Sequence, residues 1–371
     1  MLAAIVAGVA AATFAGGASA AGGVLFVSPS GSDANACNAV APCKTIGHTV
    51  AVGGSGSVIN VAPGTYAESV TITQRVLLLG NGAVIDATGH ENGISISGAD
   101  ASGTSVQGLT VENATAEGIL ASATSHLLLQ GNTVTGNDKG SGVPGAPARC
   151  FAAGNEPADC GEGLHLNGVT DSLISNNEVT GNVGGILLSD EAGPTARNTI
   201  TANYSHDNQE DCGITLASHN RSAVANPAAA GVYNNSVIGN RSQNNGAGGG
   251  GAGVGMFASA PGTASYNNRV IGNVLTGNSE AGAAVHAHAP NQNVSGNQII
   301  GNTIAGNGSD PDAGANQPTG ISLWSGVVPS SVTVIGNSIS NEYYGIFVGT
   351  NITVNGLITN SFSNVTKPIG P

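Results

Sequence analysis

Basic residues are scarce in this chain of 371 residues. Lysines and arginines number 9 against 22 aspartates and glutamates, so the formal net charge is −13 at pH 7. A surface of this sign repels polyanions, which excludes nucleic acid as a partner and makes an anionic membrane a poor one. An acidic polysaccharide would need an intervening cation.

Aromatic residues make up only 4% of the chain and charged residues 8%, whereas glycine is abundant, with 58 residues. Few helix-forming charged side chains are therefore present, and Gly, Asn, Val, Ile and Thr favour short strands and turns. The composition predicts an all-β protein.

Long apolar runs are also lacking, except at the start. Residues 2–16 are apolar and uncharged, and the small residues 18–20 that follow are typical of a cleavage site. We interpret residues 1–21 as a secretory signal peptide without its basic n-region, and a membrane-anchoring helix is the alternative. The mature protein is expected to be secreted, extracellular or periplasmic, with no membrane segment.

The five cysteines agree with export. Cys37 and Cys43 bracket one short loop, and Cys150 and Cys160 bracket another, which predicts two local disulfides. Cys212 is left over, directly before an apolar strand. We expect a buried, inert thiol there rather than a nucleophile.

An asparagine–glycine phrase recurs along the chain, for example at residues 176–182 and 297–302. It alternates with a second phrase, Gly-apolar-x-apolar, as at residues 185–188. Two short apolar pairs per repeat indicate a chain wound into a coil of short strands. We predict one parallel β-helix domain, a solenoid, over residues 22–371, with an N-terminal cap at about 22–57.

The glycine of the second phrase marks the start of each predicted turn. These glycines are Gly93, Gly118, Gly163, Gly185, Gly213, Gly253, Gly282, Gly320 and Gly345. Strands of successive turns should stack in parallel, about 4.8 Å apart. The phrase asparagines should hydrogen-bond along the axis and adopt left-handed backbone at the bend. A short capping helix is expected at residues 44–52.

Residues 25–33, 43–46 and 61–68 resemble the N-terminal cap and first turn of the right-handed parallel β-helix family, the pectate-lyase-like superfamily. The resemblance covers essentially the whole mature chain and implies a right-handed coil. It leaves the chemistry open, because the superfamily includes lyases, hydrolases, epimerases, fructotransferases and non-enzymatic surface proteins. The paired aspartates of polygalacturonases and the arginine signature of classical pectate lyases are missing, so no catalytic residue is carried over.

Loops lengthen several turns, at residues 138–162, 220–230, 246–251 and 306–318. Some precede the Gly-apolar-x-apolar strand and others follow it, so they should wall both sides of one sheet. A stiff, walled sheet face is a groove, which suits a polymer chain.

Matching positions in successive turns places Glu191 beside His219, with His288 two turns further on. Asp190 and His286 are expected on the same edge. Paired carboxylates supply an acid and a base, and a histidine oriented by a carboxylate can move a proton near neutral pH. We therefore predict Glu191, His219, His288 and Asp190 as catalytic residues.

Four further side chains are expected to contact substrate: His165, Arg221, His286 and Trp324. An arginine would neutralise a uronate carboxylate, and tryptophan would stack on a sugar ring. Asp207 and Asp211 lie in an acidic turn that is either a solvated turn or a calcium site, so Ca²⁺ is the one cofactor considered. Zinc at His286 and His288 is opposed by the lack of a third nearby histidine.

These patterns favour a secreted polysaccharide lyase or related glycan-cleaving enzyme that binds a polysaccharide or oligosaccharide in the groove. The alternative is a non-catalytic glycan-binding surface protein. A metal-handling role, like that of the β-helical copper-insertion accessory proteins, is opposed by two methionines and sparse histidines, so metal analysis should be empty. A monomer and a homotrimer both remain open.

Overall fold

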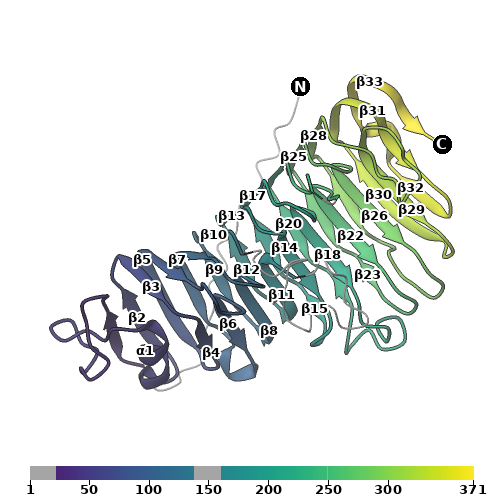
Figure 1. Cartoon of the computed structure of the whole chain (residues 1–371). Helices are drawn as coiled ribbons and strands as arrows, with labels where there is room; N and C mark the ends of the chain where they lie inside the picture. Colours follow the sequence, from purple (N-terminus) through teal and green to yellow (C-terminus); the bar gives the residue numbers. More distant parts are fainter. Residues whose placement is uncertain (1–21, 138–159, 249) are drawn as a thin grey trace, which may run out of the picture.

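The computed structural model describes residues 22–137, 160–248 and 250–371. Over these ranges the chain winds into a long coil of short strands, and α1 (Ile46–Gly53), the α-helix found there, lies near the N-terminal end (Figure 1). The all-β solenoid and its helical cap are thus confirmed. The predicted signal peptide, residues 1–21, lies outside the described residues, and no helix within them is long and apolar enough to cross a membrane.

Every pairing between the named strands is parallel, and the pairings form three continuous series, one for each face of the coil. The first face contains β4 (Val70–Ile72), β6 (Ile94–Ser97), β8 (Ile119–Ser125), β11 (Glu162–Thr170), β14 (Gly184–Ser189), β18 (Ile214–Ser218), β22 (Val254–Ala258), β26 (Ala283–Ala287), β29 (Thr319–Ser325) and the end of β31 (Ser338–Val348).

The second face contains β1 (Val24–Val27), β2 (Ser57–Val61), β5 (Val76–Asp86), β7 (Ser105–Glu112), β9 (Leu128–Gln130), β12 (Leu173–Ser175), β16 (Thr199–Thr201), β20 (Ser236–Ile238), β24 (Arg269–Ile271), β27 (Gln298–Ile300), β30 (Ser330–Ile335) and β32 (Ile352–Asn355). The third face contains β3 (Gly64–Ala67), β10 (Thr133–Thr135), β13 (Glu178–Thr180), β17 (Tyr204–His206), β21 (Arg241–Gln243), β25 (Val274–Thr276), β28 (Thr303–Ala305) and β33 (Ser361–Gly370), with parts of β5, β7 and β31. The short strands β15 (Thr195–Ala196), β19 (Val232–Tyr233) and β23 (Ser265–Tyr266) stack where the chain leaves the first face.

On the first face, two apolar residues in each Gly-apolar-x-apolar phrase are enough to fill the core of one turn. Leu164 of β11 pairs with Ile186 of β14, so the predicted turns that start at Gly163 and Gly185 stack directly on each other. Ile186 and Leu188 point into the coil and are 0% exposed, whereas the residue between them points outward. Each turn thus adds one layer to a single narrow core.

Glycine opens each of these strands because the next turn lies too close for a side chain. A Cβ at Gly213 would lie 1.9 Å from Ser242 Oγ, well inside van der Waals contact. The repeat of the glycine is therefore a consequence of the tight bend that leads into the first face.

Asparagine ladders hold successive turns together, as predicted. The longest joins Asn132, Asn177, Asn203, Asn240, Asn273, Asn302, Asn337 and Asn360. At each step Nδ2 of one asparagine donates to Oδ1 of the next, at 2.8–3.0 Å. All of these asparagines except Asn360 are buried, and each accepts a hydrogen bond from a backbone N–H of the preceding turn as well, as Asn240 does from Asn203 N.

The expectation that ladder asparagines are themselves left-handed is wrong. The residue before them has positive φ, as at Asn176 (55°) and Gly239 (64°). That residue makes the bend, and the following asparagine is left to point its amide along the axis. Asn and Gly share the bend position because both tolerate this backbone.

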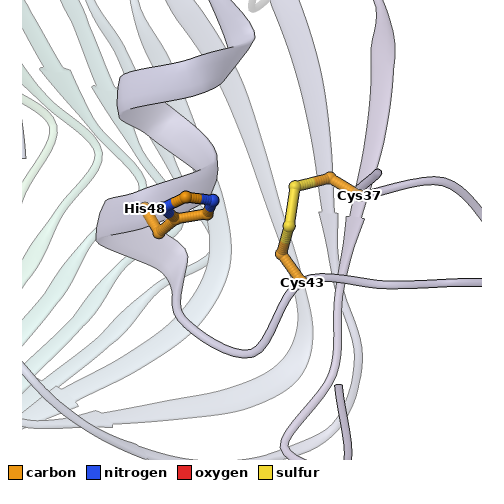
Figure 2. Close-up of side chains that lie close together, drawn as sticks. All are labelled: Cys37, Cys43 and His48. Carbon is orange, nitrogen blue, oxygen red and sulfur yellow. A yellow bond between two sulfur atoms is a disulfide. The ribbon is translucent and has the colours of Figure 1, made fainter. Parts of the chain in front are cut away.

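The disulfide between Cys37 and Cys43 is present beside α1 (Figure 2). The second predicted pair includes Cys150, which lies outside the described residues. Cys212 is a free cysteine, 2% exposed, and burial raises the pKa of its thiol well above the usual value. The predicted burial of this thiol is therefore confirmed, and its raised pKa agrees with low reactivity.

A second series of stacked asparagines ends with Asn307, which bonds the carboxylate of Glu342. This contact leads to a prediction about stability. Asn307 donates from its backbone N and from Nδ2 to Glu342 Oε1, at 2.9 and 3.0 Å. The other oxygen is buried and has no hydrogen-bond partner within the described part of the chain. Burial raises the pKa of Glu342 to about 7, and the Asn307 bonds offset this only in part.

We expect Glu342→Gln to stabilise the protein at pH 8 by about 2 kcal/mol, because glutamine keeps the acceptor and removes a buried charge. A raised folded pKa favours the native state below the unfolded value, and this contribution is lost as the pH rises through about 7. Thermal unfolding at pH 4 and pH 8 should therefore show the gain at pH 8 only. An equal change at both values would contradict this origin.

Candidate active site

A pocket of about 450 Å³ lies on the first face, over β18, β22 and β26. Its floor consists of outward side chains of these strands, including Thr215, Ala217, Phe257 and His286. One wall comes from the turns before the strands: Glu210, Asp211, Cys212, Gly250, Glu280 and Asp312. The other wall, after the strands, consists of His219, Ser259 and His288. Walls on both sides of one sheet are the arrangement that the loop positions predicted.

The lining is rich in titratable groups. It holds four carboxylates and three histidines, and none of the described residues that line it is a lysine or arginine. Glu280 was not foreseen from the sequence. Burial raises its pKa to about 7, helped by Asp310 and other nearby carboxylates and opposed by His286. Its position could have been found from the sequence, because Glu280 precedes Gly282 by the same spacing as Asp211 precedes Gly213.

Glu191 and His219 are in contact, as the turn-by-turn alignment predicts. His219 Nδ1 lies 2.6 Å from Glu191 Oε1, and the imidazole is 3% exposed. Burial raises the pKa of Glu191, but the hydrogen bond and charge of His219 outweigh it and lower the value to about 2. A carboxylate that accepts a hydrogen bond from Nδ1–H selects the tautomer in which Nε2 carries the lone pair.

Behind Glu191 a chain of buried side chains continues into the wall. Ser189 Oγ donates to Glu191 Oε2 at 2.5 Å and lies 2.8 Å from His165 Nε2. His165 Nδ1 lies 3.2 Å from Glu117 Oε1, and Glu117 is 0% exposed. His165 is not among the residues that line the pocket, and both of its ring nitrogens face side-chain partners, so the structure does not place it for the expected substrate contact. Its position is that of a residue that orients Ser189 and Glu191.

Asp190 is not among the residues that line the pocket. It is 0% exposed and lies in the inward column, where Ser218 and Ala258 are paired. Its carboxylate accepts hydrogen bonds from the backbone N of His219 (2.7 Å) and of Gly231 (2.7 Å). It also accepts from Ser218 Oγ (2.9 Å) and the Asn220 N (3.0 Å). Asp190 therefore fixes both ends of the loop at residues 220–230 instead of facing substrate.

His286 and Trp324 lie in one column of outward side chains on the first face. Phe257, His286 and Trp324 are paired across β22, β26 and β29. The His288 ring meets Trp324 edge-on, with centroids 5.2 Å apart. Arg221 is exposed and is not among the residues that line the pocket.

Asp207 and Asp211 do not form a joint site. Asp207 Oδ2 lies 2.6 Å from His206 Nδ1 on a separate shallow surface, whereas Asp211 faces the pocket and accepts from Thr215 Oγ1 at 3.3 Å. Neither belongs to a group of His, Cys, Asp and Glu in the described ranges whose ligand atoms lie within 4.8 Å of one another. The expected calcium position is therefore not supported by the geometry.

Comparison with known proteins agrees with this architecture. A family model described as a right handed beta helix region matches residues 92–240. No curated protein matches the sequence.

Solved structures share the fold at low identity. Pectate lyase Pel9A superimposes with a TM-score of 0.62 at 17% identity, over 92% of this chain and 80% of the lyase. The A-module of the Azotobacter vinelandii mannuronan C-5 epimerase AlgE4 gives 0.58 at 16%, over 94% and 88%. PfbA, a surface adhesin of Streptococcus pneumoniae, gives 0.56 at 14%, over 86% and 84%. The chain therefore has the right-handed parallel β-helix fold that these solved structures share.

Proposed function

We propose that this protein is a secreted β-helix enzyme that cleaves a polysaccharide bound along the first face. The observation that carries the proposal is the Glu191–His219 pair, 2.6 Å apart, at the edge of a pocket that also contains Glu280. A repeat coil does not need a carboxylate paired with a buried imidazole for its stability. Such pairs supply a positioned base in enzymes.

The groups fit a proton-transfer reaction. In β-elimination from a uronate, His219 Nε2 takes the proton from the carbon beside the carboxyl group, the glycosidic C–O bond breaks, and Glu280 gives a proton to the leaving oxygen. A carboxylic acid with a pKa of about 7 still carries its proton at mildly acidic and neutral pH. Ser189 and His165 keep Glu191 in place, and Trp324 provides an aromatic surface beside His288.

Two further observations support an extracellular glycan as the substrate. The disulfide between Cys37 and Cys43 is typical of an oxidising compartment. The structural relatives include a pectate lyase and a mannuronan epimerase, which act on polyuronates by their names.

The second candidate function is glycan adhesion without turnover. It is favoured by the likeness to the adhesin PfbA, which has a similar TM-score to the two enzymes. It differs in one measurable respect, because adhesion does not require the titratable pair at Glu191 and His219.

A glycan screen tests the choice. Pectate, alginate, rhamnogalacturonan and neutral glucans are incubated with the protein, and unsaturated products are followed by ultraviolet absorbance and new reducing ends by a colorimetric assay. Absorbance with reducing ends indicates a lyase, and reducing ends alone indicate a hydrolase. Binding to a glycan array without either product would overturn the enzyme proposal in favour of adhesion.

A further inference from the structure

Three metal-binding side chains meet in the groove at the end opposite Glu191. The ligand atoms of His286, His288 and Asp312 all lie within 4.8 Å of one another. His286 is on β26, His288 follows this strand, and Asp312 belongs to the loop before β29. The sequence offers no third histidine near His286 and His288 for zinc. In the structure the third ligand atom comes from Asp312, 24 residues further along the chain from His288.

His286 is oriented in the way that metal-ligating histidines are. Its Nε2 lies 2.8 Å from Oδ2 of Asp310, a carboxylate that is 0% exposed. This contact occupies one ring nitrogen and leaves Nδ1 for a metal ion. A histidine held by a buried carboxylate on its far side is the usual outer arrangement of a metal site, because it fixes the ring and raises its basicity.

The third ligand is held on a short, fixed loop. Asp310 and Ala315 exchange backbone hydrogen bonds at 2.8 and 2.9 Å, and Gly314 N donates to Pro311 O at 2.9 Å. Asp312 therefore lies at the tip of a closed turn, and Asp310 at its base orients His286. One loop thus supplies a ligand and also the carboxylate behind another ligand.

The surroundings favour a cation. Glu280 and Asp211 line the same pocket, and within the described ranges no lysine or arginine lines it. Phe257 and Trp324 border His286, with ring centroids at 5.3 and 6.2 Å, which limits access by water from two sides. His288 and Asp312 are exposed and can rotate the small amount needed for metal–ligand bonds of about 2.1 Å.

We propose that His286, His288 and Asp312 bind one divalent transition-metal ion of the zinc class, with an open coordination position toward the groove. Two imidazoles and one carboxylate suit Zn²⁺ and its neighbours better than Ca²⁺, which takes oxygen ligands. Three protein ligands leave a fourth position for water or for a carboxylate or hydroxyl group of a ligand. Metal binding can be measured without substrate, so its test does not depend on the proposed glycan cleavage.

The experiment titrates chelator-treated, untagged protein with Zn²⁺ by calorimetry at pH 7.5 and measures bound metal by elemental analysis. We expect one ion per chain, and affinity reduced about 100-fold or more in His288→Ala and in Asp312→Asn, both at exposed positions. Asp310→Asn should weaken binding about 10-fold or more through His286. Co²⁺ should give visible absorption bands that His288→Ala removes.

The controls separate this site from the other candidate. Cys37, Cys43 and His48 also lie close together, but Figure 2 shows the two sulfurs bonded to each other. The titration is therefore done without reductant, and His48→Ala should bind as wild type. His90→Ala and Asp100→Asn, both at exposed positions, are the matched surface controls. Wild-type protein that binds no Zn²⁺, or affinity that survives both His288→Ala and Asp312→Asn, would overturn the proposal.

Discussion

Glycan cleavage should fall about 1,000-fold in His219→Ala, whereas glycan affinity and thermal stability should change little. The imidazole is the only group in contact with Glu191 Oε1 that also lines the pocket among the residues described. A positioned general base contributes about 10²–10⁴-fold to a rate, and alanine removes it without filling the groove. Initial rates on the glycan identified by the screen, with binding measured in parallel, give the comparison.

His90→Ala is the matched control, because His90 is exposed and lies at the capped end, away from the pocket. Glu191→Gln adds a second, independent change. A glutamine that turns its amide N–H toward Nδ1 favours the tautomer with the ring proton on Nε2, so Nε2 no longer acts as a base; this should cost about 100-fold in rate while the contact persists. If His219→Ala retained the wild-type rate, the proposed base would be refuted; if it lost binding in proportion to rate, adhesion by the same edge would be the better interpretation.

The second large effect is on folding. We expect Asn240→Ala to lower the free energy of unfolding by about 4 kcal/mol. Asn240 is 1% exposed and bonds two other ladder asparagines and the carbonyl of Ile200. Alanine leaves several buried donors and acceptors unpaired, at about 1–3 kcal/mol each. Urea unfolding followed by circular dichroism measures the loss.

Asn316→Ala serves as the comparison, since Asn316 is exposed and makes only a long contact, 3.4 Å, with Gly314 O. Its effect should remain within about 0.5 kcal/mol. A loss below 1 kcal/mol in Asn240→Ala would show that the turns are held by strand pairing and apolar packing, with little from the ladder. Because repeat proteins can unfold in parts, a broadened transition in Asn240→Ala alone would also be consistent with a break at that turn.

The fold could be read from the sequence because it is periodic. The register between successive turns depends on residues that recur at fixed offsets, so the sequence alone predicts that Leu164 pairs with Ile186. The same periodicity placed Glu191 beside His219. Offsets within one turn are short, and an error of one residue would have turned apolar side chains outward.

Contacts made by loops could not be predicted from the periodicity of the sequence. Asp312 reaches His288 because the turn at residues 310–315 closes on itself, and this closure has no periodic signal. Burial was not predicted either: Asp190 occupies an inward position of its turn, and His165, although on an outward position, is 5% exposed. Glu280 could have been found from its spacing before Gly282, but its raised pKa depends on carboxylates from other turns.

Local spacing is enough to specify the coil, the asparagine ladders and the edge that carries Glu191 and His219. Which polar groups reach the groove and which are enclosed depends on how irregular loops fold over a regular surface, and this follows from the three-dimensional packing alone. Short-range pattern fixes the coil, and long-range packing selects the chemistry available on it.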